Sequence, residues 1–517
     1  MDERKFEIII HAPDERFLSR LIQSLEAVVV PENFSAEIQS VTGAEKYFAY
    51  DAAMRASDAR YKIYLDERAV VADKNFLFEL LRIFNSDERI AAVGTSGALE
   101  LSTHGISLLS AKRTPKNFRG EVEVADGFFF ATQYDLPWRH DLFKDKFFGG
   151  QAQCVEFRRA GGKIFCGGDW ISFDEENFSF DENARQKFLD EYSKDLFPLV
   201  SVIIPTFNRP KYFKEALDSA LNQTYRNVEI FVSDNSTDDA TERLIATYDD
   251  ARIKYFRHEN FDANDNWNFA RDYNNPAAEY VNWLMDDDLF YPPKIEKMIE
   301  IYRNHPDVSL VTSKRQIIDA DGKITGESET PFKDSCKVTG EAAGNFLFKS
   351  FNNFIGEPTT VFIRKKFLRD GDLCWHDDER GYFNLVDMST WCQLLSKGNL
   401  FFINEPLSCC RLHSGMASLW NYTHPLVAVQ WVKLIKSAWE RKIFLRTEED
   451  LRLSILQWLG ELGVERLKIS FANKYHGKEV QTLEKYVVTM AQALSNGYKI
   501  ELPPVEYSAQ DKIKKIR

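Results

Sequence analysis

The sequence predicts an α/β protein with two mostly parallel sheets, followed by a helical C-terminal region. Short apolar, β-branched runs alternate with amphipathic helix patterns in residues 1–195 and again in residues 196–418. From about Thr423 onward the pattern is helical only. A chain of 517 residues has room for three domains of ordinary size. We therefore expect domains at 1–195, 196–418 and 419–517.

The second stretch opens with a strand and a helix. The β-branched run at 199–204 stops at Pro205, which is typical of a buried strand. Apolar residues then recur at helical spacing from Phe213 to Leu221. Further strands are expected at 228–233, 253–256 and 280–285.

Polar side chains follow three of these strands. Thr206 ends the first, Asp234 follows the second, and Asp286–Asp288 follow the last. In a parallel sheet the carboxyl ends of the strands lie at one edge, where ligands bind. We therefore expect these side chains to form one site.

Asp286–Asp288 carry the strongest functional signal in the chain. Adjacent carboxylates repel one another unless a hard cation lies among their oxygens. Mg²⁺ or Mn²⁺ held by one or two carboxylates completes its shell with water and substrate phosphates. A solvated acidic turn is the alternative interpretation.

Two long stretches resemble a known family. They read PLVSVIIPTFNRPKYFKEALDSALNQTYRNVEIFVSDNSTDDAT from Pro198 and NWLMDDDLFYPPKIEKM from Asn282. Together they are similar to the nucleotide-sugar half of family-2 glycosyltransferases, which have the GT-A fold. The resemblance extends over residues 198–415, in which several motifs occur in the family's order.

The resemblance implies a set of functional residues. A DxD-type metal motif corresponds to Asp286–Asp288, and Asp234 corresponds to a uridine-contacting Asp. The donor-binding residues that it implies are Pro205, Thr206, Asn208, Arg209, Asp234, Asn266, Asn268, Asp286, Asp287 and Arg411. For Asn266 and Asn268, ordinary helix capping is the alternative.

The charge balance agrees with a bound cation. The net charge is −13 and the pI is near 5.4, so the protein as a whole does not attract a dianionic donor. A sugar diphosphate therefore needs a local positive centre. A divalent cation, Mn²⁺ or Mg²⁺, that bridges both phosphates also stabilises the charge of the leaving group.

The resemblance implies a catalytic base about a hundred residues beyond the metal motif. Asp387 occupies that place, although Val386 replaces the first residue of the frequent Glu-Asp pair. An inverting transfer needs one carboxylate to take the proton of the acceptor hydroxyl. We expect Asp387 in that role, with Glu357 as the second candidate base or as an acceptor contact. For Asp387, an N-cap of the following helix is the alternative.

His413 and Arg411 end the predicted transferase domain. Related enzymes use a histidine in this region in the metal or diphosphate shell, and imidazole is a plausible ligand of Mn²⁺. A purely structural histidine is the alternative. The planar guanidinium of Arg411 suits a phosphate.

The first 195 residues resemble the glycosyltransferase-like domain of the streptomycin-biosynthesis type, which also has the GT-A architecture. The likeness depends mainly on VADGFFFATQYDLPWR and VEFRRAGGKI. Arg68 stands where such domains carry an Asp, and Phe147–Gly150 replace expected polar groups. We expect a degenerate domain that binds acceptor, glycan or the second domain. Alternatively, it transfers sugar without metal and Arg68 replaces the cation.

The C-terminal residues predict a small helical bundle. Thr447 and Asp450 form a capping-box pattern, and Val480, Leu483 and Val487 follow helical spacing. The bundle is expected to pack against the transferase domain or to form a homodimer. The basic tail at 512–517 either touches an anionic membrane surface or is solvated.

The remaining patterns concern location. No run of about 18 apolar residues and no secretory signal are present, so we expect a cytoplasmic, bacterial protein without a transmembrane segment. Seven cysteines without a CxxC pair favour a reducing compartment and argue against zinc.

We predict an inverting, metal-dependent glycosyltransferase that moves a hexose from a nucleotide sugar, a UDP-sugar by the Asp234 inference. The acceptor is a glycan, a lipid-linked saccharide or a protein side chain, and no nucleic acid is involved. One alternative is a non-catalytic glycan- or partner-binding protein built from glycosyltransferase-like domains. A nucleotidyltransferase is disfavoured because Pro205–Asn208 supply no glycine-rich or basic loop.

Overall fold

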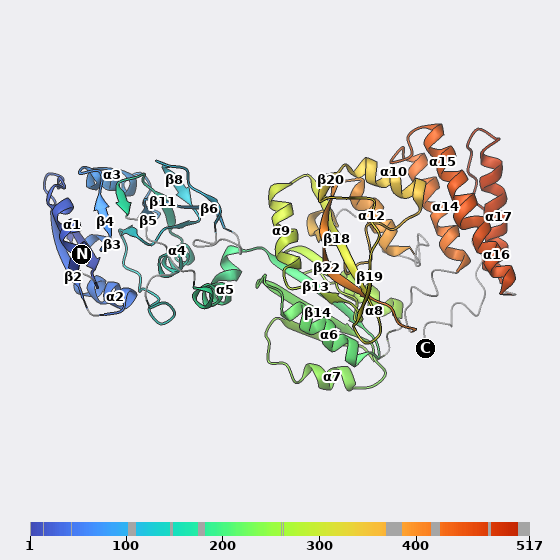
Figure 1. Ribbon diagram of the computed structural model, residues 1–517, viewed down its shortest axis with the longest axis horizontal. Coiled ribbons are helices and arrows are strands. Elements are labelled where there is room, and N and C mark those ends of the chain that lie inside the picture. Colours follow the sequence, from blue (N-terminus) through green and yellow to red (C-terminus); the bar gives the residue numbers. More distant parts are fainter. Residues whose placement is uncertain are drawn as a thin grey trace. The chain divides into compact units, whose positions relative to one another are not determined.

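The computed structural model describes most of the chain. The described residues are 2–13, 15–42, 44–101, 110–144, 148–173, 181–259, 261, 263–368, 385–414, 424–473 and 477–504. They form two compact units, Met1–Phe197 and Pro198–Arg517, which we treat separately. The fold class is α/β with large, mostly parallel sheets and C-terminal helices, as predicted (Figure 1).

The first unit has a seven-stranded central sheet among its described residues, with the order β2-β1-β3-β10-β5-β11-β8. The strands of this unit, which include those of two smaller sheets, are β1 Asp2–His11, β2 Ser35–Val41, β3 Ala59–Asp66, β4 Ala69–Val71, β5 Ile90–Gly94, β6 Gly97–Leu101, β7 Ser110–Arg113, β8 Gly120–Val122, β9 Val124–Ala125, β10 Phe129–Thr132, β11 Lys163–Cys166 and β12 Ile171–Phe173. Its helices are α1 Glu15–Glu26, α2 Lys46–Ala56, α3 Phe76–Phe84, α4 Gly149–Arg159 and α5 Glu182–Leu196.

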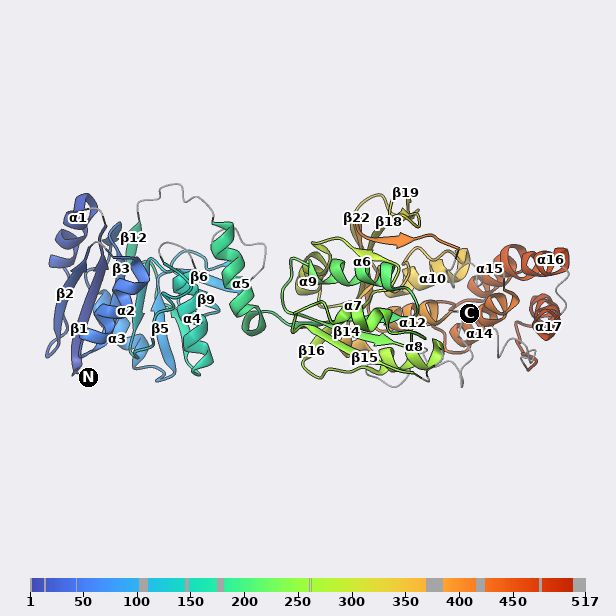
Figure 2. The same ribbon diagram turned by 90° about the horizontal axis from the view of Figure 1, so that it is seen from below.

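The second unit has a ten-stranded sheet among its described residues. Its main path is β15-β14-β13-β16-β21-β18-β22-β17, with β19 on β18 and β20 on β22. Figure 2 shows β18, β19 and β22 side by side. The strands are β13 Leu199–Thr206, β14 Val228–Asp234, β15 Ile253–Arg257, β16 Ala278–Trp283, β17 Leu289–Phe290, β18 Val308–Ile318, β19 Ile324–Glu327, β20 Cys336–Val338, β21 Phe362–Arg364 and β22 Asn399–Arg411.

The helices of the second unit cover this sheet and continue into the C-terminal region. They are α6 Pro210–Leu221, α7 Ala240–Ile245, α8 Ala263–Asp272, α9 Lys294–Asn304, α10 Gly340–Ser350, α12 Val386–Leu395, α14 Pro425–Glu440, α15 Glu448–Trp458, α16 Val464–Ala472 and α17 Lys478–Ala493. A 3₁₀ turn at Lys365–Phe367 and a π-helical turn at Leu459–Gly463 complete the list. Within the described residues, no helix combines the length and the apolar character that a membrane span requires.

The two sheets share one arrangement of strands. In each, a central strand is flanked by two parallel neighbours, and an antiparallel strand then separates it from a second parallel pair. By position, β3 corresponds to β16, β10 to β21, and β11 to β22. Likewise α4 directly precedes β11 as α12 directly precedes β22. This correspondence identifies equivalent sites in the two units.

Alternating residues of β13 and β14 face opposite helical layers. Ile203 and Phe231 belong to the large core that includes Trp391 of α12 and Trp458 of α15. Helices α14–α17 lie side by side in both views (Figures 1 and 2). The C-terminal helices therefore share a core with the sheet. The predicted domain boundaries at 195 and 418 stay predictions, and so does the predicted homodimer.

This shared core gives a stability prediction. Trp458 is fully buried and its indole N–H donates to the carbonyl of Ala428 at 3.0 Å. We expect Trp458→Ala to lower the free energy of unfolding by about 3–5 kcal/mol. The control Leu456→Ala, at a side chain 44% exposed on the same helix, should change it by less than about 0.5 kcal/mol. Urea unfolding followed by circular dichroism checks both, and helices that melted separately from an unaffected sheet would contradict the shared core.

Candidate active site

The three adjacent carboxylates lie in the turn that follows β16. Asp286 and Asp287 form the turn, and the backbone N–H of Asp288 donates to the Met285 carbonyl at 3.0 Å. Strand β17 begins one residue later and pairs with β22, which fixes the turn against the sheet. Asp286 and Asp288 are buried, whereas Asp287 is the most exposed of the three.

Each carboxylate has different partners. Asp286 accepts hydrogen bonds from the Thr206 hydroxyl at 2.9 Å and the Phe207 backbone N–H at 3.3 Å. Asp288 accepts from the Thr359 hydroxyl at 2.6 Å and the Arg411 backbone N–H at 2.9 Å. Asp288 is thus bonded to the loop before β21 and to the end of β22.

Asp287 is the carboxylate that faces positive or polarisable groups. Its Oδ2 lies 2.9 Å from Nη1 of Arg209 and 2.9 Å from Nε2 of His413. The same Nη1 of Arg209 contacts Oδ1 of Asp286 at 3.1 Å. Arg209 therefore bridges the first two carboxylates.

Burial and mutual repulsion disfavour full ionisation of this cluster. Burial, and then the charge of Asp287, raise the pKa of Asp286 to about 6, although Arg209 and Thr206 act in the opposite direction. The same two causes raise the pKa of Asp288 well above its usual range. Within the described residues, no three His, Cys, Asp or Glu side chains already converge as a metal site. A cation here would need Arg209 to move from Asp287.

Asp234 lies at the end of β14 and is fully buried. Its two oxygens accept hydrogen bonds from the Ser236 backbone N–H at 2.8 Å and the Tyr255 hydroxyl at 2.7 Å. Asn208, in a left-handed conformation with φ of 52°, donates its backbone N–H to the Ser236 hydroxyl at 2.9 Å. The loops after β13 and β14 are therefore bonded to each other beside Asp234.

Asn266 connects the same two strand ends. It lies inside α8, accepts from the Ser233 hydroxyl at 2.6 Å, and donates to the carbonyls of Ser233 and Thr206 at 3.1 and 3.3 Å. Its side chain thus bonds to strand ends instead of capping a helix. Residue 268 also belongs to α8, but its side chain lies outside the described part of the structure.

Asp387 is the second residue of α12, not its N-cap, which is Leu385. It accepts from the Met388 backbone N–H at 2.7 Å and from the Asn353 amide at 3.4 Å. Burial, and to a smaller extent the negative charge of Glu357, raise its pKa to about 6. Such a carboxylate is a suitable proton acceptor near neutral pH.

The loop before β21 connects Asp387 with the carboxylate cluster. Glu357 lies in this loop and forms an ion pair with Arg315 of β18. Two residues later Thr359 bonds to Asp288, and the indole N–H of Trp391 donates to the Gly356 carbonyl at 3.0 Å. The site therefore has a carboxylate-cluster side and an α12 side, and one loop connects them.

Arg411 and His413 lie at the end of β22 but differ in surroundings. The side chain of Arg411 is fully buried, donates to the carbonyls of Asp287, Asp319 and Ala320, and pairs with Glu215. Arg411 thus stabilises the turn through the carbonyl of Asp287. Its contact with a phosphate stays a prediction. His413 faces Asp287, and its ring lies 5.0 Å from that of Tyr212 of α6.

The sequence did not identify Thr359, Asn353 or Arg315 as parts of the site. Threonine, asparagine and arginine are common in loops and strands, and their contacts form only through the fold. A possible signal for Thr359 was its place in the polar segment that directly precedes the apolar run Val361–Ile363.

The equivalent site of the first unit has different chemistry. Asp66 ends β3, and its carboxylate is paired with Lys46 at 3.3 Å and Arg68 at 2.8 Å. These two cations hold the pKa of Asp66 far below its usual range, against the opposing effect of burial. Gly150 takes the place of Asp387 as the second residue of its helix. A Cβ at position 150 would lie 2.6 Å from Cα of Gly127, so no larger residue fits.

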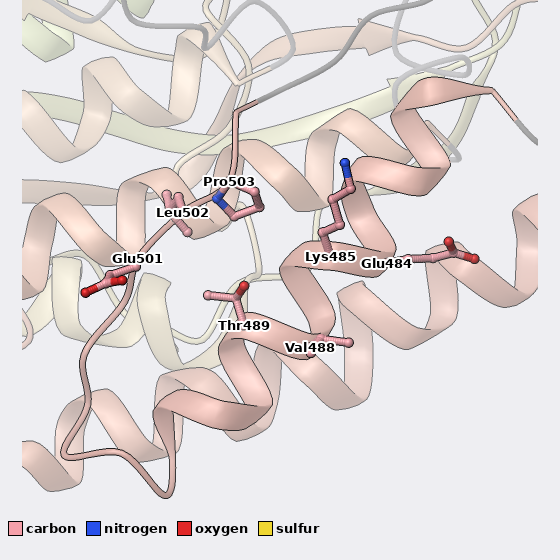
Figure 3. Close-up of a pocket in the computed structure, with 7 residues that line it drawn as sticks. All are labelled: Glu484, Lys485, Val488, Thr489, Glu501, Leu502 and Pro503. Atoms are coloured by element: carbon pink, nitrogen blue, oxygen red, sulfur yellow. The ribbon is translucent and has the colours of Figure 1, made fainter.

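A separate hollow of about 620 Å³ lies along α17. Figure 3 shows that Glu484, Lys485, Val488 and Thr489 line it from the helix, and that 501–503 line it from the chain beyond. None of these residues belongs to the carboxylate cluster or to the loop before β21. The hollow therefore adds nothing to the candidate active site.

Comparison with known proteins identifies the family. Residues 201–371 match the model described as glycosyl transferase family 2. The central domain belongs to glycosyl transferase family 2. Residues 7–120 and 106–192 match a model described as glycosyltransferase like family, whereas the streptomycin-type assignment stays a prediction. The predicted class of enzyme, a glycosyltransferase, is confirmed.

Individual relatives cover different shares of the chain. An uncharacterized glycosyltransferase of Rickettsia typhi is 28% identical over 295 residues, which are 56% of this chain and 86% of that protein. A GalNAc(5)-diNAcBac-PP-undecaprenol beta-1,3-glucosyltransferase of Campylobacter jejuni is 39% identical over 93 residues, 18% of this chain and 30% of that protein. S. aureus TarS 1-349, solved in complex with UDP-GlcNAc, is 16% identical with a TM-score of 0.38 and covers 60% of this chain and 97% of that chain.

Proposed function

We propose that the second unit transfers a hexose from a UDP-sugar to a saccharide acceptor with inversion, and that the transfer depends on Mn²⁺ or Mg²⁺. The observation that carries the proposal is the Asp286–Asp288 turn, at the strand ends of a family-2 glycosyltransferase domain, with His413 beside Asp287. Asp387 supplies a carboxylate with a pKa near neutrality on the other side of the loop.

The donor would lie along the ends of β13, β14 and β16. Asp234 and the loop of Thr206 and Asn208 form the nucleoside end of this path. The diphosphate end lies at Asp287, Arg209 and His413. This order follows the sheet, in which β14, β13 and β16 are direct neighbours.

Asp287 and His413 fit a divalent cation. Their nearest atoms are 2.9 Å apart, and a carboxylate with an imidazole is an acceptable donor pair for Mn²⁺. Asp286 could join the shell through Oδ1, whose partner is Arg209, whereas the two oxygens of Asp288 accept hydrogen bonds from Thr359 and from the backbone of Arg411. The bound ion would neutralise the charge of the diphosphate leaving group.

Asp387 would act as the general base. As the acceptor oxygen forms its bond to C1, the hydroxyl proton passes to the Asp387 carboxylate and the bond from C1 to the diphosphate breaks on the opposite face. Asn353 and the backbone of Met388 orient this carboxylate. Glu357, which pairs with Arg315, would accept a hydrogen bond from a second acceptor hydroxyl.

The acceptor is a lipid-linked saccharide in this proposal. Support comes from the Campylobacter jejuni relative, whose name specifies a PP-undecaprenol-linked saccharide. Surface glycans and protein side chains are the other acceptor classes.

We further propose that the first unit transfers no sugar. Lys46 and Arg68 neutralise the carboxylate at its strand end, and the close approach at Gly150 excludes a base at the place of Asp387. It would serve instead to bind glycan or acceptor. A non-catalytic role for the whole chain is disfavoured by the carboxylate cluster of the second unit, which a binding protein has no need to retain.

The donor proposal is tested by a screen of common UDP-hexoses and other nucleotide sugars, each with Mn²⁺, in which the released nucleoside diphosphate is measured. We expect the protein to release UDP from a UDP-hexose, and we expect this release to stop when EDTA removes the metal. Asp287→Ala should abolish this release, whereas Asp321→Ala, an exposed carboxylate in the turn before β19, should not. Equal release by the Asp287→Ala variant would contradict the proposal.

The role of Asp387 gives a pH prediction. Because the base acts deprotonated and its pKa is raised to about 6, kcat/KM should fall as the pH decreases below about 6 and level off above it. Asp387→Asn should reduce kcat by about 10²–10⁴-fold.

Glu357→Gln removes the like charge that helps to raise the pKa of Asp387, so the acid limb should move to lower pH. Glu341→Gln, at the surface of α10, is the control and should leave the limb in place. If Glu357→Gln abolished turnover and Asp387→Asn did not, the assignments of base and acceptor contact would be reversed.

The difference between the units predicts one metal per chain. Titration of the full chain with Mn²⁺ in the presence of UDP should give a stoichiometry of one. Asp287→Ala should weaken binding by at least about tenfold, since even indirect partners of a metal ligand have effects of that size. Asp66→Ala should leave the titration unchanged. Two equivalent sites would overturn the proposal for the first unit.

A further inference from the structure

Arg209 occupies a special position in the carboxylate cluster. It is the residue before α6, at the end of the loop that follows β13. Its Nη1 lies 3.1 Å from Oδ1 of Asp286 and 2.9 Å from Oδ2 of Asp287, and its side chain is 26% exposed. The guanidinium is thus an internal counter-charge for two neighbouring carboxylates and can still reach solvent.

The contact with Asp287 involves a shared atom. Oδ2 of Asp287, which Arg209 contacts, is also the oxygen that faces Nε2 of His413 at 2.9 Å. A divalent cation between Asp287 and His413 would meet the guanidinium at this oxygen. Two cations on one carboxylate oxygen repel each other, so Arg209 and the metal compete for it.

The other cation of the cluster is not free to move. Arg411 is fully buried, donates to three backbone carbonyls and pairs with Glu215. The side chain of Arg209 is 26% exposed, contacts Asp286 and Asp287 through Nη1, and belongs to the residue that precedes α6. A bound metal would therefore displace the guanidinium of Arg209 and not that of Arg411.

We propose that Arg209 is a latch that couples metal binding to donor binding. Before the metal binds, the guanidinium holds Asp286 and Asp287 together. If Asp287 and His413 held the metal, the guanidinium would leave Asp287, and its planar N–H groups would bind the diphosphate oxygens of the donor. This inference rests on the proposed function, because it requires a metal and a sugar diphosphate at this turn.

The latch has a thermodynamic consequence. Metal alone must displace Arg209 without a new partner for the guanidinium, so it binds weakly. Metal together with diphosphate gives the guanidinium a partner, so each ligand strengthens the binding of the other. By linkage the effect is reciprocal, and couplings of this kind are typically about 5–150-fold.

The test is the binding of Mn²⁺ to the full chain, followed by electron paramagnetic resonance with and without UDP. In the wild type we expect weak binding of Mn²⁺ alone and at least about fivefold tighter binding when UDP is present. Arg209→Ala should bind Mn²⁺ alone more tightly than the wild type. Its Mn²⁺ affinity should respond little to UDP, and its affinity for UDP should be lower.

Two further variants sharpen the comparison. Arg209→Lys keeps a charge that competes with the metal but lacks the planar fork, so Mn²⁺ alone should bind as weakly as in the wild type, with reduced coupling to UDP. Arg243→Ala, at an exposed side chain of α7 that pairs with Asp239, is the control and should match the wild type. If Arg209→Ala does not fold, Arg209→Gln serves in its place.

The outcomes separate this inference from the proposed function. Mn²⁺ affinity that is unchanged or weakened in a folded Arg209→Ala variant, with a wild type that binds Mn²⁺ and transfers sugar, overturns the latch alone. A wild type that binds no Mn²⁺ with or without UDP overturns both. Tighter Mn²⁺ binding in Arg209→Ala with lost coupling supports the latch.

Discussion

The candidate site depends on the cost of placing carboxylates side by side at a buried strand end. Asp286 and Asp288 are nearly inaccessible, and Asp287 lies between them. The surrounding structure compensates for this repulsion with a threonine hydroxyl on each side, a backbone N–H from β22, and the guanidinium of Arg209. The position of the loops around β13, β21 and β22 follows from these contacts. A cluster of this kind is suited to exchange one counter-charge for another.

The two units show how one strand arrangement can carry different charge balances. In the second unit, three carboxylates share the strand-end turn, and Arg209 is the cation that bridges two of them. In the first unit, one carboxylate at the equivalent place is paired with both Lys46 and Arg68. The difference concerns a few side chains in turns, while the order and direction of the central strands are the same. In our proposal, function therefore differs between the units through site residues and not through the fold.

The strand ends could be predicted from the sequence, because apolar runs and the polar residues that stop them are local features. Thr206 bonds to Asp286 and lies opposite Asp234 in the sheet register, and Asp387 lies in the first turn of a helix. The long-range contacts could not be predicted. Arg209 reaches Asp286 across 77 residues, and Thr359 reaches Asp288 across 71, through a register that only the folded sheet sets. The pair between Arg411 and Glu215 is of the same kind, since it joins residues of β22 and α6 that lie far apart in the sequence.

A crystal structure of the full chain with Mn²⁺ and a UDP-sugar tests the account most directly, because the anomalous signal of manganese locates the ion without reference to activity. We predict one strong peak between the Asp287 carboxylate and the His413 imidazole, next to the diphosphate of the donor. A donor bound at the ends of β13 and β14 without such a peak, or a peak at Asp66 of the first unit, would contradict it.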